Sequence, residues 1–293
     1  MSESETSGEV TVRSYVRRRA PSNIHEEEPG EPTFSVEKLD WPSFRRRFAR
    51  LFLQGHQVVL LGGPDAGKTH LAILLAEIRA FSFMVVTKPR DPLIPLMTTR
   101  GWAVSDSLEP AAQLVYVTDD RGNAVIDPQT GQQMVRPVYP RFVYWPQPFP
   151  DPDLTLRQDA LVKSAQIQAA LALVKRHGSW CLLVDELNYL SQTLGLRDDL
   201  AELYHTARSN KISIIGAAQR PSWVPRAAVD NPSHIFVFQA GDRDELRRLG
   251  EITGGLSYKE MAQEISTLNW QGHEFLYVNP HRRLAYRSAA PPW

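Results

Sequence analysis

The sequence predicts an α/β fold in which a mainly parallel sheet is sandwiched by helices. Short apolar runs of strand length alternate along the chain with longer segments of helical periodicity. A glycine-rich segment, residues 62–69, lies between one such run and an apolar helix. A second apolar run, residues 180–184, ends in two carboxylates, Asp185 and Glu186. In open α/β sheets, ligands bind beyond the carboxyl ends of the strands, where both features are expected to lie.

The composition is that of a globular protein without a general attraction to polyanions. The chain has 293 residues, of which 42% are hydrophobic, and its 33 basic and 33 acidic residues cancel. This length can bury a full core, and the neutral balance means that any contact with DNA has to be local. The single cysteine, Cys181, lies in an apolar run and is predicted to be a buried structural thiol. No apolar run reaches membrane-spanning length and no secretory segment is evident, so we expect a cytoplasmic protein without membrane insertion.

The first elements of the chain are a tail and an amphipathic helix. Residues 1–33 are polar and rich in charge clusters and proline, which predicts a disordered N-terminal tail before a folded domain at residues 34–293. From Trp41, aromatic residues recur at helical spacing while arginines at positions 45–47 and 50 fill the other face. We expect the aromatic stripe to pack in the core. The arginine face is interpreted as solvated, with contact to phosphate as the alternative.

Residues 62–69 fit the phosphate-binding pattern G-x-x-x-x-G-K-[ST], known as Walker A, between a strand at 57–61 and a helix at 70–78. Free backbone N–H groups and the helix dipole at such a turn favour a bound anion. Lys68 would place a positive charge near the β and γ phosphates, and Thr69 would offer its hydroxyl to Mg²⁺. The pattern predicts nucleotide binding, with ATP and Mg²⁺ as cofactors. The expected binding residues are Gly62, Gly63, Pro64, Asp65, Ala66, Gly67, Lys68, Thr69 and His70.

A second strand is predicted at residues 83–87, followed by Lys88, which faces the nucleotide, a substrate or only solvent. Residues 114–145 differ from their surroundings, because short apolar runs alternate there with turn signals at 119–123 and 128–131. They predict a β-hairpin insertion that leads into a further core strand.

The second half of the chain continues the alternation of helices and strands. A helix is predicted from Leu156 to His177, ended by Gly178 and carrying one apolar face. That face consists of Leu161, Ala165, Ala169, Ala172 and Leu173. The remaining predicted elements are a strand at 180–185, a helix at 196–209, strands at 212–218 and 234–239, helices at 243–252 and 257–266, and strands at 273–278 and 283–287.

The carboxylates of Asp185 and Glu186 form a candidate Walker B site. A buried strand tip is a costly place for two acids unless a cation meets them, and Mg²⁺ would be that cation. We expect Asp185 to hold the metal and Glu186 to orient or deprotonate the water that attacks the γ phosphate. The strand at 212–218 ends in Gln219, whose amide can hydrogen-bond the attacking water or the γ phosphate, or simply cap a loop.

These motifs together resemble the FtsK/HerA superfamily of P-loop ATPases, which have an additional strand and a catalytic glutamate. The resemblance rests on the phosphate loop (residues 62–69), the run 183–186, Arg208, and the run 217–222 with Gln219, Arg220 and Pro221, and it covers roughly residues 55–88 and 178–250. It implies a ring, expected to be a hexamer, in which Arg208 completes a neighbouring subunit's site. Arg220 is the alternative for that role.

The resemblance has departures that bear on function. The sequence has no membrane segment and no evident winged-helix module of the kind that FtsK-type chromosome motors carry, and the insertion at 114–145 has no place in the family pattern. We therefore expect a cytosolic motor that translocates or packages double-stranded DNA, for example of a virus or mobile element. Two other classes stay open: an ATP-dependent switch or assembly factor that binds protein partners through the insertion, and a small-molecule kinase, against which Glu186 argues.

Overall fold

The computed structural model describes residues 35–292, except 129–130, 148, 150, 221, 223, 231, 239–242 and 254–257. The predicted tail at 1–33, part of the predicted turn at 128–131 and Pro221 therefore lie outside the described residues. The strands are β1 Val36–Lys38, β2 Gln57–Leu61, β3 Ser82–Val85, β4 Ala103–Ser105, β5 Leu114–Tyr116, β6 Val135–Pro137, β7 Arg141–Tyr144, β8 Cys181–Val184, β9 Ser213–Ala218, β10 His234–Val237, β11 Glu274–Asn279 and β12 Leu284–Ala289.

The helices are α1 Trp41–Leu51, α2 Lys68–Ala76, α3 Leu93–Thr99, α4 Glu109–Ala112, α5 Leu156–His177, α6 Arg197–Thr206, α7 Arg226–Val229, α8 Arg243–Thr253 and α9 Tyr258–Ser266, with a π-helix at Tyr189–Thr193 and a 3₁₀ turn at Pro280–Arg282. The α5 bounds agree with the prediction, and a capping box between Thr155 and Gln158 explains where α5 begins. The elements β1, α3, β4, α4 and α7 are short and were not anticipated.

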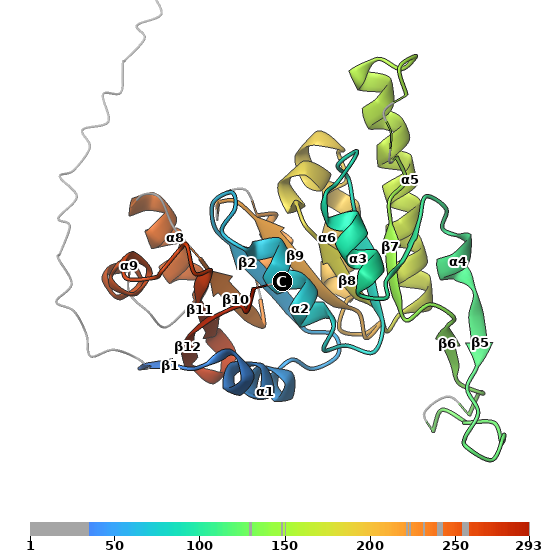
Figure 1. Cartoon of the computed structure of the whole chain (residues 1–293), viewed down its shortest axis with the longest axis horizontal. Coiled ribbons are helices and arrows are strands. Elements are labelled where there is room, and N and C mark those ends of the chain that lie inside the picture. The colour runs from blue at the N-terminus through green and yellow to red at the C-terminus, as the bar shows by residue number, and fades with distance from the viewer. Residues whose placement is uncertain are drawn as a thin grey trace, which may run out of the picture. The chain divides into compact units, whose positions relative to one another are not determined.

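A ten-stranded sheet has the order β1-β12-β11-β10-β2-β9-β8-β3-β7-β4 (Figure 1). From β10 to β4 every neighbouring pair is parallel, whereas β11 is antiparallel to both β10 and β12. The predicted class, a mainly parallel sheet sandwiched by helices, is confirmed. Strand β9 lies between β2, which leads into the phosphate loop, and β8, which ends at the two acids.

Two apolar layers lie on opposite faces of this sheet. Alternate residues of β2 divide between them: Val58 and Leu60 pack with α1 and α2, whereas Val59 and Leu61 pack with α5 and α6. Cys181 is fully buried in the layer with α1 and α2, as predicted, and burial raises the pKa of its thiol to about 12. Both faces of the central strands are therefore dry, as expected for a parallel sheet.

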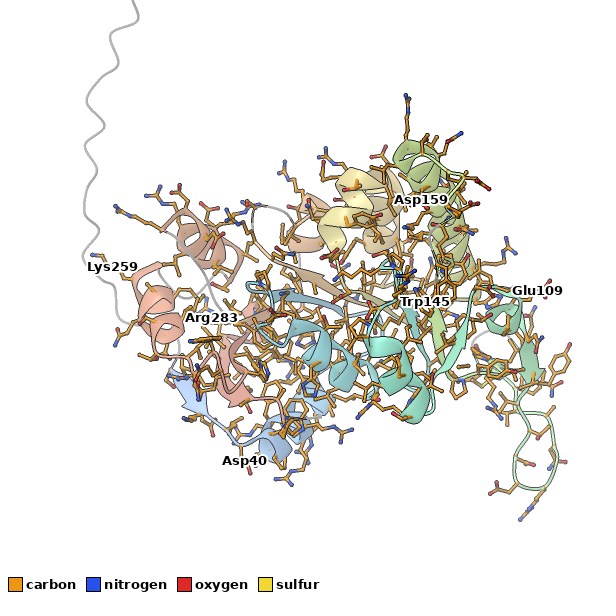
Figure 2. The ribbon with its side chains drawn as sticks, turned by 45° about the horizontal axis from the view of Figure 1, so that its top comes forward. Asp40, Glu109, Trp145, Asp159, Lys259 and Arg283 are labelled. Atoms are coloured by element: carbon orange, nitrogen blue, oxygen red, sulfur yellow. The ribbon has the colours of Figure 1, made fainter. Side chains whose placement is uncertain are left out.

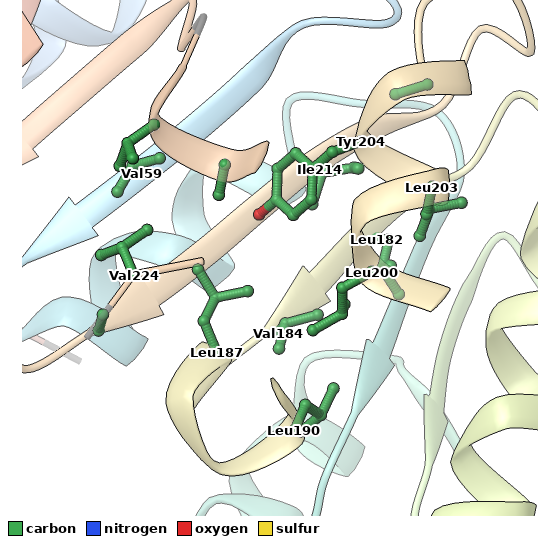
Figure 3. Packing of buried hydrophobic residues seen from close by; sticks show 14 of the residues in the cluster. Val59, Leu182, Val184, Leu187, Leu190, Leu200, Leu203, Tyr204, Ile214 and Val224 are labelled. Carbon is green, nitrogen blue, oxygen red and sulfur yellow. The ribbon is translucent and has the colours of Figure 1, made fainter. Parts of the chain in front are cut away.

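Close packing on the α6 face requires a glycine in β9. A Cβ added at Gly216 would lie 2.5 Å from Leu187 Cδ1 and 2.8 Å from the hydroxyl of Tyr204. Figure 3 shows Tyr204 and Leu187 pointing toward the sheet between Val59 and Val184. The helix α6 and the turn after β8 are thus seated directly on β9, which fixes the segment that follows Asp185 and Glu186.

The apolar face predicted for α5 is wrong except at Leu173, which is half-buried against the core. Ala165, Ala169 and Ala172 are exposed, and the Leu161 side chain is 63% exposed. The buried residues are Lys163, Ile167, Ala170, Leu171 and Val174. Alanine is common on both the buried and the exposed face of a helix. The larger apolar side chains of Ile167, Leu171 and Val174 therefore determine which face is buried.

The insertion is a thin β ribbon. Strands β5 and β6 form a separate two-stranded antiparallel sheet, extended by isolated bridges between Thr118 and Ala124 and between Ile126 and Gln133. β7, in contrast, belongs to the main sheet. Figures 1 and 2 show the ribbon extending away from the sheet with side chains on both sides. Among the described residues, no helix combines the length and apolar character required to cross a membrane.

We predict that Phe44→Ala lowers the free energy of unfolding by about 3–5 kcal/mol, because it removes a fully buried ring. The Phe44 ring lies edge-on to Phe236, Phe275 and Tyr277 at centroid distances of 6.0, 5.1 and 5.5 Å. Urea unfolding measures the change, with the exposed Leu161→Ala as the control, expected within about 0.5 kcal/mol of the parent. A Phe44→Ala cost equal to that of the control would contradict the packing described here.

Candidate functional site

The phosphate loop has the backbone conformation that the motif requires. Gly67 is the N-cap of α2 with φ 93°, and Asp65 also has a positive φ of 56°. A Cβ at Gly67 would meet the ring of His273, at 2.8 Å from Nδ1. Glycine is therefore required at this position for two reasons, the left-handed conformation and the close approach of the imidazole.

Lys68 lies over its own loop. Its Nζ donates a hydrogen bond of 2.6 Å to the carbonyl of Gly63. Burial lowers the pKa of the Lys68 ammonium, while the charges of Asp185 and Glu186 act in the opposite direction. The side chain is thus held at the loop, close to the two acids at the end of β8.

Thr69 and Asp185 meet directly. The Thr69 hydroxyl donates to Asp185 Oδ1 at 2.5 Å, joining the first turn of α2 to the end of β8. This contact unites the two residues predicted to bind a metal, although they lie 116 positions apart in the sequence. Both residues also line one cavity.

Lys88, which follows β3, is exposed but reaches the two acids. Its Nζ lies 3.8 Å from Asp185 Oδ2 and 3.6 Å from Glu186 Oε1. Trp145 is the residue after β7, and its Nε1 donates a hydrogen bond to the carbonyl of Lys88. The sequence left the direction of Lys88 open. The structure shows that this lysine partly balances the acids at the strand tip.

A cavity of about 760 Å³ lies at the carboxyl ends of β2, β9, β8 and β3. Gln219, at the end of β9, is part of its lining together with most of the phosphate loop and the two acids. The cavity is lined by Pro64, Asp65, Ala66, Gly67, Lys68, Thr69, His70, Lys88, Asp91, Pro92, Leu93, Asp185, Glu186, Asn188, Tyr189, Thr193, Ala218, Gln219, His273 and Pro292. Gly62 and Gly63 form the start of the loop, and the N–H of Gly62 donates to the carbonyl of Ala218.

His273 and Tyr189 line the cavity but were not anticipated. His273 precedes β11, far from the motifs in sequence, and no local pattern marks it as part of a site. Tyr189 begins the π-helix three residues after Glu186, and this closeness in sequence to the acids is the one local signal that could have identified it. Burial lowers the pKa of His70 to about 4, which leaves that imidazole neutral at pH 7.

The two arginines named from the sequence are not part of this cavity. Arg208 is exposed and precedes β9, at the opposite end of the strand from Gln219, where its backbone packs against Gly55. Arg220 forms an ion pair of 3.6 Å with Glu245 of α8. Within one chain, Arg208 therefore lies at the far edge of the sheet from the phosphate loop.

The donor set at the cavity fits Mg²⁺. A hydroxyl and a carboxylate are the hard oxygen ligands that Mg²⁺ prefers, and the ion typically takes one or two carboxylates plus phosphate oxygens and water. Among the described residues, no cluster of three or more His, Cys, Asp or Glu side chains is arranged to hold a metal. Thr69 and Asp185 would thus hold a metal only jointly with phosphate groups and water.

A β-strand inserted between the phosphate-loop strand and the strand with the acids defines the additional-strand class of P-loop NTPase folds. No family model matches the chain, and neither does any curated protein sequence. The fold is similar to that of the genome packaging NTPase B204 from Sulfolobus turreted icosahedral virus 2 in complex with sulfate, with a TM-score of 0.54 and 16% identity over 82% of this chain and 99% of that chain.

VirB4 of Thermoanaerobacter pseudethanolicus is similar to the same degree, with a TM-score of 0.54 and 15% identity over 80% of this chain and 90% of that one. A structure of B204 in complex with AMPPCP matches with a TM-score of 0.52 and 16% identity over 81% of this chain and 98% of that chain. The chain therefore shares its fold with B204 and VirB4, which agrees with the P-loop NTPase fold that its motifs predict.

We predict that Gly67→Ala lowers nucleotide affinity at least about tenfold, since a left-handed non-glycine residue costs about 1–2 kcal/mol before any clash with His273. Removing the imidazole with His273→Ala in the same chain should restore part of the affinity, because only the clash is relieved. Titration with a labelled ATP analogue measures both variants and His273→Ala alone.

Gly101→Ala provides the matched control for this substitution. Gly101 also has a positive φ, of 78°, but no atom lies within 4 Å of an added Cβ, and it is outside the cavity. It should lose stability and keep its affinity. Unchanged affinity in Gly67→Ala would show that the loop does not hold the nucleotide in this conformation.

Proposed function

We propose that the protein is a Mg²⁺-dependent ATPase of the FtsK/HerA type. The observation that carries the proposal is the hydrogen bond between Thr69 and Asp185 at a cavity that also contains Lys68, Glu186 and Gln219. A hydroxyl and an acid that are distant in sequence converge there beside a phosphate-binding loop. The similarity of the fold to NTPases crystallised with nucleotides agrees with it.

In this proposal each residue has a distinct role. Lys68 and the N–H groups of the phosphate loop bind the phosphates. Thr69 and Asp185 would hold Mg²⁺, which would supply positive charge beside the phosphates. Glu186 accepts a proton from the attacking water, and Gln219 orients that water or the γ phosphate. Hydrolysis then releases ADP and inorganic phosphate.

The charge of the cavity lining explains why cations from outside the chain are needed. Its acids are Asp65, Asp91, Asp185 and Glu186, and its cations are Lys68 and Lys88, so the formal charge is 2 − 4 = −2. Bound triphosphate adds further negative charge. Mg²⁺ and an arginine from a neighbouring copy would supply the missing positive charge.

The proposal includes a cytoplasmic ring, in which residues 34–293 form the ATPase domain and Arg208 acts on the next subunit's nucleotide. The exposure of Arg208 and its distance from its own cavity support a role in trans, with Arg220 as the alternative. Proteins named for genome packaging share the fold, which supports double-stranded DNA as the cargo. A hexamer is the ring size expected from the resemblance.

One observation favours the second candidate, an ATP-dependent switch that acts on protein partners. Leu114, Val115, Tyr116 and Val135 are all exposed on the two-stranded ribbon of the insertion, Tyr116 by 69%. Consecutive residues of a strand point to opposite sides, so both faces of the ribbon present apolar groups to solvent. An isolated two-stranded ribbon is marginally stable in water, and a bound protein would cover it.

ATP turnover with and without duplex DNA, at about 50 and 200 mM salt, separates the two candidates. Stimulation by DNA that weakens with salt supports the motor. Turnover that is indifferent to nucleic acid supports the switch. Release of free phosphate, rather than transfer to a metabolite, excludes the kinase.

We predict that Glu186→Gln keeps ATP bound but slows hydrolysis by about 100-fold or more, because it removes a positioned base without changing the size of the side chain. Lys68→Ala should instead lose most nucleotide affinity. Phosphate release and nucleotide titration measure the two effects separately. Near-normal turnover in Glu186→Gln would reject the role assigned to that residue.

We predict that Arg208→Ala abolishes most turnover alone and that mixing it with Lys68→Ala restores part of it. Each mixed ring would contain sites with an intact phosphate loop beside an intact arginine. Turnover is measured across mixing ratios, and sedimentation verifies that the variants still assemble. Intact assembly without any recovery of activity would exclude action in trans.

A further inference from the structure

The edge of the sheet opposite the cavity is a continuous surface built from distant parts of the chain. We name it the amino-terminal edge: the segments just before the central parallel strands and the turn between β11 and β12. It comprises residues 53–56, 78–81, 178–180, 207–212, 232–233 and 280–283. Antiparallel pairing of β11 with β10 brings the 280–283 turn to this edge.

Hydrogen bonds join these segments into one unit. The Gln54 side chain donates to the carbonyls of Ser179 and Lys211. The His56 Nδ1 lies 2.9 Å from His234 Nε2, and the Ser233 N–H donates to the carbonyl of Gln57. The Arg79 guanidinium donates to the carbonyl of Phe52 and to the Gln54 side chain. These bonds fix the backbones of the segments before β2, β3, β8, β9 and β10 relative to one another.

The amino-terminal edge is rich in cations. Its segments contain Arg79, Arg208, Lys211, Arg282 and Arg283, and the acids that directly adjoin them, Glu77 and Asp230, pair with Arg100 and Arg226. All of the cations on these segments except Arg79 are exposed. Within the described residues, Arg208, Arg282 and Arg283 form no ion pair with a carboxylate. In a chain of zero net charge, this is a marked local excess.

The imidazole of His56 reports how closely these cations gather. Its pKa is lowered first by burial and then by the charges of Arg208, Arg79, His281 and Arg282. Those residues come from three separate segments of the edge. Acids on the flanking helices pair elsewhere: Glu77 with Arg100, Glu202 with Lys175, and Asp230 with Arg226.

The cations extend along the edge rather than meeting at a point. Arg282 lies in the turn that follows β11, and Lys211 precedes β9, with β10 and β2 between these strands. Three strand spacings correspond to roughly 14 Å. Duplex DNA carries one negative charge per about 1.7 Å of its axis, so such a row spans several phosphates.

We propose that the amino-terminal edge binds the phosphate backbone of double-stranded nucleic acid. The inference rests on the proposed function, because it names the surface through which that motor holds its cargo. Arg208 alone would serve a neighbouring copy's nucleotide at one point. Lys211, Arg282 and Arg283 extend along the edge beyond it and are left for a second polyanion. Contacts to phosphates carry no sequence information, which suits an ATPase that moves along DNA.

The test compares two double charge reversals. Arg282→Glu with Arg283→Glu changes the edge while leaving Arg208 and the cavity intact. Arg45→Glu with Arg46→Glu makes the same change in charge on the exposed face of α1, the surface that the sequence alone would favour. Binding of a labelled DNA duplex is measured by fluorescence anisotropy over a range of salt, and ATP turnover without DNA checks that each variant is folded.

We expect the edge variant to bind the duplex at least about tenfold more weakly. The slope of log affinity against log salt concentration should decrease by about two, which corresponds to the loss of two phosphate contacts. The α1 variant should stay within about twofold of the parent, and turnover without DNA should be unchanged in both. Loss of binding only in the α1 variant would show that the amino-terminal edge is not the DNA-binding surface. It would not contradict the proposed function as a DNA motor.

Two further outcomes would also overturn it. If the parent turns over ATP but binds no duplex, the DNA cargo of the proposed function fails together with this surface. If the edge variant keeps its affinity for DNA but no longer self-associates in sedimentation, the edge is an interface between copies.

Discussion

The parallel register of four neighbouring strands is the constraint on which the site depends. Leu61 of β2 pairs with Ala218 of β9, and Val184 of β8 pairs with Gly216 of β9 and Val85 of β3. Because the strands run in the same direction, the segments that follow them reach one edge: the phosphate loop, Gln219, the two acids and Lys88. A shift of one residue in β8 would exchange its two faces and turn Asp185 away from Thr69.

The packing beneath that edge makes such a shift costly. Gly216 admits Tyr204 and Leu187 to contact distance on one face, and Cys181 and Leu183 fill the other. Carboxylates at the end of a strand that is buried on both faces are costly unless hydrogen-bond donors or cations lie beside them. The hydroxyl of Thr69 and the ammonium groups of Lys68 and Lys88 provide them. The core that fixes the strand register therefore also places the charged groups of the site within contact distance of one another.

Local patterns predicted the fold class, the phosphate loop, the acidic strand and both ends of α5, because each depends on residues close together in sequence. Features that depend on pairing between distant segments were not predictable. The imidazole of His273 above Gly67 and the contact of Lys88 with the acids require the order of strands in the sheet. The buried face of α5 was predicted wrongly, since alanine fits both the core and the surface. The elements between 88 and 113 are too short to leave a periodic signal.

Zero net charge conceals a separation of charge between the two edges of the sheet. The cavity lining is formally negative and depends on added cations to hold a triphosphate, whereas the amino-terminal edge is rich in positive groups. No single stretch of sequence displays this separation, because the acids of the cavity and the arginines of the opposite edge come from loops scattered along the chain. Parallel strands sort these two sets of loops onto opposite edges. One sheet can therefore hold nucleotide at one edge and a second polyanion at the other without the two competing for the same cations.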